Sequence, residues 1–379
     1  MKTPSPAALA ALALALATPA RAEEPIAVGA LLSMTGAAAF LGGPEARTLE
    51  MLAEELNERG GVRGRKVRLV IKDTGGNPEK AISFAKQLIE EEKVFAIIGP
   101  ATSGETMAVK NLAEETGTLL ISCAAAEVIV NPVARWVFKT AQKDGHAAVR
   151  IFQQMKKMGI VRVGLLASNT GFGKAGKEQI EKLAPEHGIQ IAVSEVYDKA
   201  ATDLTAEVTK LKAAGVQAIL NWSIEPAQAI VIKNARQLGM TVPIFQSHGF
   251  GNLSYAKAAG AAAEGVIFPQ GMLTVAEALP ASHPQKAVLV GYKKAYEARY
   301  KEDVSAFGGY AHDAFHLLVK AIQEVGADPE KVRGAIEGTR GFVGASGVFN
   351  FGPADHNGLD LSSFEMLTVR DGKFVLLDR

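Results

Sequence analysis

Residues 94–105, VFAIIGPATSGE, decide the fold of this chain. An apolar run of the kind found in buried strands breaks off at Gly99-Pro100, and Thr102 and Glu105 then have the spacing of a helix capping box. We therefore expect a strand that turns directly into a helix. The start of that helix offers backbone N–H groups and the hydroxyls of Thr102 and Ser103, which suits a carboxylate or a phosphate. The alternative is that Thr102 does no more than cap the helix.

A second break of the same kind follows closely. The run TLLISCAAAE at 118–127 is again a strand-like segment that ends in small residues. The carboxyl ends of adjacent parallel strands meet at one edge of a sheet, so both breaks should lie side by side. The two loops together predict a site for an anionic group.

The first 22 residues have the pattern of an export signal. Lys2 supplies the positive start, an alanine- and leucine-rich run follows at 7–17, and Ala20-Arg21-Ala22 fits a small-x-small cleavage site. We expect cleavage after Ala22 and a periplasmic mature protein. No lipid-attachment cysteine follows the signal, which argues against a lipid anchor.

Composition excludes several classes of protein. The 41 basic and 40 acidic side chains nearly balance, so nothing indicates binding to nucleic acid or to an anionic membrane. No segment after the signal has the roughly 20 apolar residues that span a bilayer, and we expect no stable membrane insertion. Cys123 is the single cysteine, so no internal disulfide can form, and we expect it to be a small buried hydrophobe rather than a nucleophile.

Apolar strand-like runs alternate with amphipathic stretches along the mature chain, a pattern typical of parallel sheets covered by helices on both faces. The alternation restarts after residue 138, which predicts an α/β protein with two Rossmann-like lobes. Besides the two segments above, the expected strands are Ile26–Leu32, Lys66–Lys72, Trp136–Phe138, Arg162–Ala167, Ile189–Val196, Ala218–Asn221 and Pro243–Gln246. The expected helices are near Gly43–Arg59, Pro78–Glu92, Gly145–Met158, Gly173–His187, Leu204–Ala214 and Pro226–Leu238, with a long helical region at Gln285–Gly338. The chain should end in a hairpin of Phe364–Val369 and Phe374–Leu377, because Asp371-Gly372 is a strong turn signal.

Two facing lobes create a cleft lined by the carboxyl ends of their strands, and the polar breaks there should hold the binding groups. Several aromatic residues fall in or near these loops, and with a helix start they describe an apolar pocket with one anion-holding end. The breaks are Ser33–Gly43, Ala101–Gly104, Ala124–Glu127, Ser168–Gly173, Asn221–Glu225 and Ser247–Gly251. The rings are Phe40, Phe172, Trp222, Phe250 and Tyr310, together with His248.

Two motifs point weakly toward an enzyme. NTGFGKAGK at 169–177 resembles a nucleotide-binding glycine loop, but Glu178 stands where a phosphate loop needs a hydroxyl for magnesium. His312 and His316 have a metal-ligand spacing without an obvious third ligand. We prefer a glycine-rich helix start and partly buried packing histidines, and we expect no catalytic residue, metal or cofactor.

At this point the residues carry a family likeness over essentially the whole mature chain. They resemble the leucine/isoleucine/valine-binding family, type I periplasmic solute-binding proteins that serve ABC importers, and some look closer to its aromatic-acid (coumarate-type) branch. The family segments are LNERGGVRGRKVRLVIKDTGGNPEKA (56–81), IIGPATSGETMAV (97–109), VFKTAQKDG (137–145) and GVFNFGPADHNGLD (347–360). The branch segments are ALPASHPQKA (278–287), SAFGGYAHDAF (305–315) and Asp355-His356-Asn357-Gly358.

The resemblance implies two lobes joined by three crossovers. They would comprise 23–141 plus 272–349 and 142–271 plus 350–379. It also implies a monomeric receptor that closes around a small molecule and delivers it to ABC permease subunits. The ligand-binding positions that we expect are Thr102, Ser103, Gly104, Ala124, Ala126, Leu41 and Tyr310 in the first lobe, with Phe172, Ile224 and His248 in the second.

The departures from the family bear on the ligand. Ala126 stands where the family has a threonine, Ile224 replaces an aromatic hydroxyl, and His248 replaces the acidic residue that takes an amino acid's ammonium. An unpaired buried charge is costly. Our hypothesis is therefore a carboxylate without an α-amino group and with an apolar or aromatic body, such as an aromatic acid or a branched oxo acid. Glu225 could still take an ammonium, so a branched-chain amino-acid receptor stays open, as does an exported enzyme.

Overall fold

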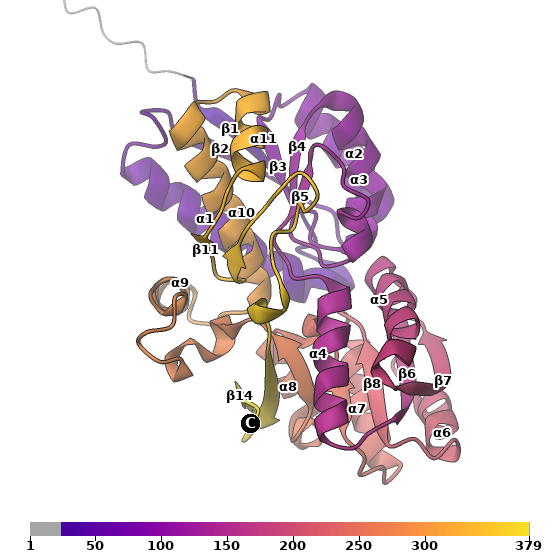
Figure 1. Ribbon diagram of the computed structural model, residues 1–379. Coiled ribbons are helices and arrows are strands. Elements are labelled where there is room, and N and C mark those ends of the chain that lie inside the picture. The colour runs from indigo at the N-terminus through magenta and orange to yellow at the C-terminus, as the bar shows by residue number, and fades with distance from the viewer. Residues whose placement is uncertain (1–23, 379) are drawn as a thin grey trace, which may run out of the picture.

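The computed structural model describes residues 24–378 (Figure 1). The export signal predicted for residues 1–22 lies outside them. Two lobes are stacked, each with a central sheet flanked by helices, and the yellow C-terminal segment passes from one lobe to the other. None of the helices in the described chain is long and apolar enough to cross a membrane.

The first lobe has a five-stranded parallel sheet in the order β2-β1-β3-β4-β5. The strands are β1 Ile26–Leu32, β2 Val67–Asp73, β3 Ala96–Ile98, β4 Leu119–Ser122 and β5 Val137–Lys139. The helices that connect or extend them are α1 Ala39–Glu58, α2 Pro78–Glu90, α3 Ser103–Thr116, α10 Ala306–Val325 and α11 Pro329–Glu337. α1 packs along α10, and α2 packs along α3.

The second lobe has a seven-stranded sheet in the order β14-β13-β10-β9-β8-β6-β7. Its strands are β6 Arg162–Ser168, β7 Gln190–Tyr197, β8 Ala218–Trp222, β9 Ile244–Gln246, β10 Ile267–Gln270, β13 Glu365–Arg370 and β14 Lys373–Leu376. Its helices are α4 Asp144–Lys157, α5 Gly171–Leu183, α6 Thr205–Ala213, α7 Ala227–Gln237 and α8 Leu253–Ala259.

The prediction of parallel sheets holds for the first lobe and for β6 to β10, whereas β13 and β14 run antiparallel to their neighbours. The predicted hairpin is confirmed, with positive φ at Asp371 and Gly372. A two-residue turn reverses the chain, so these two strands must pair antiparallel. The second sheet is therefore mixed.

The structure differs from the prediction in one helix start and in several short elements. α1 begins at Ala39 instead of Gly43, so much of the break predicted at Ser33–Gly43 is helical. The region 285–338 is helical as predicted, and it comprises three helices, α9 Lys286–Tyr300, α10 and α11. β10, α8 and the small β11–β12 pair, Phe342–Val343 with Val348–Phe349, were not predicted, because these elements have too few residues to show a period.

The chain crosses between the lobes three times: after β5, after β10, and between β12 and β13. The crossovers are tied to one another. The Asn357 side-chain amide donates to the carbonyl oxygens of Lys139 and Ala141, at 3.2 and 2.8 Å. The Gln142 side chain also donates to Ser346 O at 2.8 Å, in the turn just before the third crossover begins. The first and third crossovers thus form one hydrogen-bonded unit beside the cleft.

Candidate functional site

The first candidate group is the start of α3. The hydroxyl of Thr102, its N-cap, accepts from Glu105 N at 3.3 Å and donates to Glu105 Oε2 at 2.5 Å. Ser33, which follows β1, donates to the same carboxylate oxygen at 2.8 Å. The cap predicted from the sequence is confirmed, and the Thr102 hydroxyl is committed to Glu105. What this helix start offers an anion is its main-chain N–H groups and the hydroxyl of Ser103.

The loop after β4 lies against that helix start, as the adjacent parallel strands predicted. Ala126 N donates to Ser103 Oγ at 3.2 Å, and Ala124 N donates to Ser122 Oγ at 3.1 Å. Ser103, Ala124 and Ala126 are all buried. Ser103 and Ala126 thus bond to each other, Ala124 N is satisfied by Ser122, and an incoming carboxylate would compete for these donors.

A buried lysine fixes the same loop. The Lys139 ammonium donates to the carbonyl oxygens of Ala125, Ala141 and Gln142, at 2.7, 2.8 and 3.2 Å. Burial lowers the pKa of Lys139, and the nearby Asp144 charge opposes this shift. Burial raises the pKa of Asp144, whose Oδ2 has no partner. Lys139 joins the binding loop to the first crossover, a role that sequence reasoning missed.

The second lobe contributes a wall of aromatic rings around His248. The imidazole contacts Phe172, Trp222 and Phe364, with ring centroids 5.4, 5.6 and 5.6 Å apart, each in an edge-to-face arrangement. Phe172 also stacks on Trp222 at 5.6 Å. Phe364 was not predicted, because it is distant in sequence and reaches the wall only through the third crossover.

His248 is buried, and neither of its ring nitrogens has a hydrogen-bond partner in the structure. Burial lowers the pKa of His248 to about 3, the Lys139 charge adds to this, and a contact with the Gln142 main chain, which does not meet hydrogen-bond geometry, opposes it. The ring is therefore neutral near pH 7, with one donor and one acceptor. A buried polar group without a partner is costly, so this position is suited to a ligand that supplies one.

A cavity of about 430 Å³ lies between the lobes next to these groups. Four of the ten predicted binding residues line it: Thr102, Gly104, Phe172 and Ile224. The other six do not border this cavity. Its remaining walls come from Ala37, Ala38, Gly75, Gly76, Pro78, Asn169, Thr170, Gly171, Lys199 and Glu225.

Leu41 and Tyr310 are buried on α1 and α10. The Tyr310 hydroxyl points toward the second crossover, 3.5 Å from Gln270 Oε1, and burial raises the pKa of Tyr310. One helical turn beyond Leu41, Glu45 is fully buried, and neither of its carboxylate oxygens has a partner. Burial, and then the Glu105 charge, raise the pKa of Glu45 well above its usual range. Sequence reasoning missed Glu45, because a charged residue in an amphipathic pattern normally lies on the exposed face of its helix.

Glu225 faces the same cavity as the α3 start. Its Oε2 accepts from Ser223 Oγ at 2.6 Å and from Ile224 N at 3.2 Å. Ile224 itself is buried, and its carbonyl accepts from Tyr255 OH at 2.5 Å. The second lobe thus has an acidic side chain at the cleft, one residue from the family position that Ile224 occupies.

The glycine-rich run is a helix start, as expected. Its glycines meet close neighbours: an added Cβ at Gly173 would lie 1.9 Å from Ser168 O, and one at Gly176 would lie 1.9 Å from Trp222 Nε1. Lys177 pairs with Glu181 at 2.6 Å. Packing therefore explains glycines at 173 and 176.

The two histidines on α10 contact each other. The rings of His312 and His316 are 4.4 Å apart, and His312 Nδ1 lies 3.0 Å from Asp313 Oδ1. Burial, and then the neighbouring His312, lower the pKa of His316 to about 4. Within residues 24–378 no three His, Cys, Asp or Glu side chains are grouped so that they could hold a metal ion. Cys123 is buried, and burial raises the pKa of its thiol well above the usual range, so the thiolate is disfavoured.

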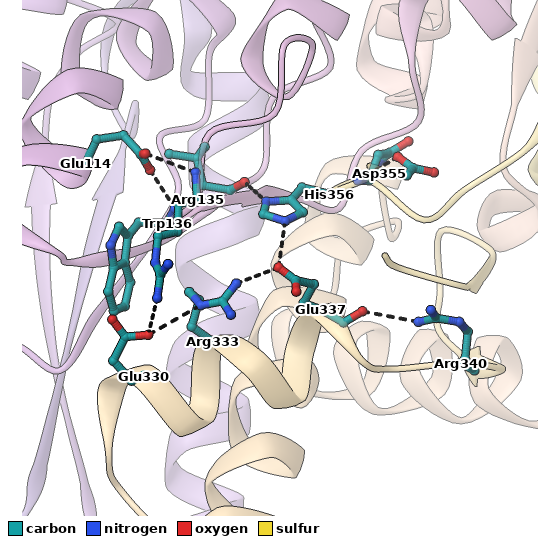
Figure 2. Close-up of polar contacts among 11 residues, drawn as sticks. Glu114, Arg135, Trp136, Glu330, Arg333, Glu337, Arg340, Asp355 and His356 are labelled. Carbon is teal, nitrogen blue, oxygen red and sulfur yellow. Dashed lines mark hydrogen bonds and ion pairs between the residues drawn. The ribbon is translucent and has the colours of Figure 1, made fainter. Parts of the chain in front are cut away.

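The Asp355–Gly358 run straps the third crossover to the first lobe (Figure 2). His356 stacks on Phe138 at 4.0 Å, and its Nδ1 lies 2.9 Å from Val137 O. Its Nε2 lies 3.4 Å from Glu337 on α11, which pairs with Arg333 at 2.5 Å. The segment that resembles the aromatic-acid branch therefore packs against the first lobe through His356.

Comparison with known proteins fits this geometry. The profile of a family described as "Periplasmic binding protein" matches residues 25–368. The chain is 27% identical over 362 residues to a leucine-, isoleucine-, valine-, threonine- and alanine-binding protein of Pseudomonas aeruginosa, covering 94% of this chain and 92% of that protein. An extracellular ligand-binding receptor from Rhodopseudomonas palustris HaA2 superposes with a TM-score of 0.88 at 28% identity, covering 93% and 99% of the two chains. The isoleucine complex of LivJ from Streptococcus pneumoniae superposes at 0.81 with 26% identity, covering 92% and 97%.

Proposed function

This chain belongs to the periplasmic binding protein family, and we propose that it is the exported solute receptor of an ABC importer. The ligand is a small carboxylate with an apolar or aromatic body, such as an aromatic acid or a branched oxo acid. It binds between the two lobes, which comprise residues 23–141 plus 272–349 and residues 142–271 plus 350–379. Closure of the hinge then presents the bound ligand to the permease. The protein needs no catalytic step for this role.

The observation that carries this proposal is the unpaired imidazole of His248 within the aromatic wall. The family resemblance puts the partner of an amino acid's ammonium at this position. A neutral imidazole held by three rings gives an ammonium no compensating charge, and burying an unpaired charge is costly. It can exchange a hydrogen bond with a phenol or a keto oxygen.

The opposite end of the site supports the carboxylate. Ser103 Oγ, the first-turn N–H groups of α3 and the N–H groups of Ala124 and Ala126 are gathered at one sheet edge. The positive end of α3 favours a negative group there. The buried Lys139 ammonium, which holds the adjacent Ala125 carbonyl, adds positive charge to the same region.

A branched-chain amino acid is the second candidate, because Glu225 lines the cleft cavity with Thr102 and Gly104. An ammonium directed at Glu225 instead of His248 would be paired. The names of the Pseudomonas relative and of the LivJ complex also favour this candidate.

Calorimetric titration of ligand-free protein distinguishes the two. We expect heat with cinnamate, benzoate or 4-methyl-2-oxopentanoate, and little with leucine, isoleucine or valine. His248→Leu should weaken the acid at least tenfold, the loss expected for one hydrogen bond of about 1.4 kcal/mol. Glu225→Gln should change acid binding little and should abolish leucine binding if leucine is the ligand.

Tight binding of leucine that depends on Glu225, with no heat from any of the acids, would overturn the carboxylate proposal and leave the amino-acid receptor. Catalytic conversion of any of these compounds by the purified protein, in place of reversible binding, would contradict the receptor role itself.

A further inference from the structure

The starts of α3 and α5 meet across the cleft, main chain against main chain. Gly104 is in the first turn of α3, and Gly171 is the first residue of α5. A Cβ added at Gly171 would lie 2.7 Å from Gly104 Cα and 2.8 Å from Gly104 N. Both are main-chain atoms, so the clash could be relieved only by moving one helix away from the other.

The contact is asymmetric. A Cβ added at Gly104 would lie 3.8 Å from Gly171 N and 3.9 Å from Gly171 Cα, which is ordinary van der Waals contact. A methyl group on the second-lobe side therefore blocks the contact, while one on the first-lobe side nearly fits.

The other glycines of the same run have a different role. Those at 173 and 176 lie against Ser168 and Trp222, all within the second lobe. Gly171 has its close contacts with Ser103 and Gly104, across the cleft. Folding of the second lobe thus demands glycine at 173 and 176, whereas only the approach of the two lobes demands it at 171.

We propose that Gly171 is a positioning residue that sets how far the cleft closes, through its contact with Gly104. Phe172 follows it directly, lines the cleft cavity and contacts His248 at 5.4 Å. The same contact that stops closure therefore fixes the distance between the aromatic wall and the α3 start. This inference rests on the proposed function, because it concerns binding by hinge closure.

Double electron–electron resonance across the cleft tests it. Nitroxides are placed at Glu79→Cys and Glu178→Cys, both exposed and on opposite lobes, in a protein whose native thiol at Cys123 is buried. Distances are recorded without addition and with saturating cinnamate or L-leucine, whichever gives heat by calorimetry. In the parent protein we expect a shorter distance with the bound compound.

Gly171→Ala should lower the closed-to-open ratio at least tenfold, and Gly104→Ala should lower it less. The Tm of ligand-free Gly171→Ala should be unchanged or slightly higher, since alanine favours a helix over glycine. Gly176→Ala should lower Tm instead, because its Cβ meets Trp222. Gly334→Ala is the control for helix propensity, since nothing lies within 4 Å of the added methyl group.

Closure of Gly171→Ala to the parent distance would overturn the inference and leave the proposed function intact. So would a Tm loss in Gly171→Ala equal to that of Gly176→Ala, because Gly171 would then serve folding. A parent protein that binds a compound without any shortening would overturn hinge closure, and the inference with it.

Discussion

The two walls of the cleft differ in how their polar groups are satisfied. On the first-lobe wall, the Thr102 hydroxyl bonds to Glu105, Ser103 Oγ accepts from Ala126 N in the loop after β4, and Lys139 has three carbonyl partners. On the second-lobe wall, the His248 imidazole is surrounded by rings and has no partner. On the binding mode proposed above, the first lobe is preorganised for the carboxylate, while the second leaves one polar position for the ligand to complete.

The largest loss of folding stability is expected when the buried cation of the first-lobe wall is removed. Lys139→Met leaves three carbonyls without their donor and Asp144 without a nearby cation, and such losses amount to about 3–5 kcal/mol of stability. Urea unfolding measures it. Lys139→Arg keeps the charge and should lose less, and an equal loss in both variants would show that shape matters here and charge does not.

Lowering the pH should reduce folding stability through His248 on the second-lobe wall. The pKa of His248 is lowered in the folded protein to about 3, so the unfolded chain binds a proton below about pH 6.5 that the folded chain excludes. This part of the stability is present above pH 6.5 and is lost as the pH falls, up to about 3 kcal/mol near pH 4. Urea unfolding of parent and His248→Asn between pH 7 and pH 4 checks this. The account predicts a shallower decline in the variant; parallel curves would contradict it.

The crossovers that hold the walls together should show a smaller effect. Asn357→Ala removes two hydrogen bonds to the main chain of the first crossover, which predicts a loss of about 1–3 kcal/mol. Asn350→Ala is the matched control, because Asn350 contributes one side-chain bond, to Gly341 N, away from that crossover. Asn357→Ala should destabilise the protein more than its control does. The reverse order would show that the hydrogen bonds between the first and third crossovers contribute little to stability.

Ser103→Ala should have the smallest effect on stability and a clear effect on binding. The Ala126 N–H loses its acceptor, which costs about 1 kcal/mol or more. Cinnamate binding should weaken about tenfold, since hydrogen bonds to charged groups contribute about 1.5–3 kcal/mol. Thr102→Ser keeps the cap and should bind as the parent does. Unchanged cinnamate affinity in Ser103→Ala would show that Ser103 does not bind the carboxylate.

Local chemistry in the sequence predicted much of this arrangement. The strand-to-helix turn at Thr102, its proximity to the loop after β4 and the Asp371-Gly372 hairpin each follow from residues close together in the chain. The family resemblance supplied His248 and Phe172, which the structure places in contact.

What the sequence could not predict depends on tertiary packing. Phe364 joins the aromatic wall only because the third crossover returns to the second lobe. The buried environment of Lys139 and Glu45 cannot be read from an amphipathic pattern, since charged residues normally mark the exposed face. The close approach of Gly104 and Gly171 joins segments of different lobes, and no periodicity records it.

We propose above that the first lobe holds a carboxylate and that the second lobe receives an uncharged body. A crystal structure of the protein with the compound that co-purifies with it tests this most directly. The account predicts a carboxylate within hydrogen-bond distance of Ser103 and the Ala124 and Ala126 amides, with an apolar or aromatic body against Phe172 and His248. An ammonium paired with Glu225, or a ligand bound outside the cleft, would contradict it.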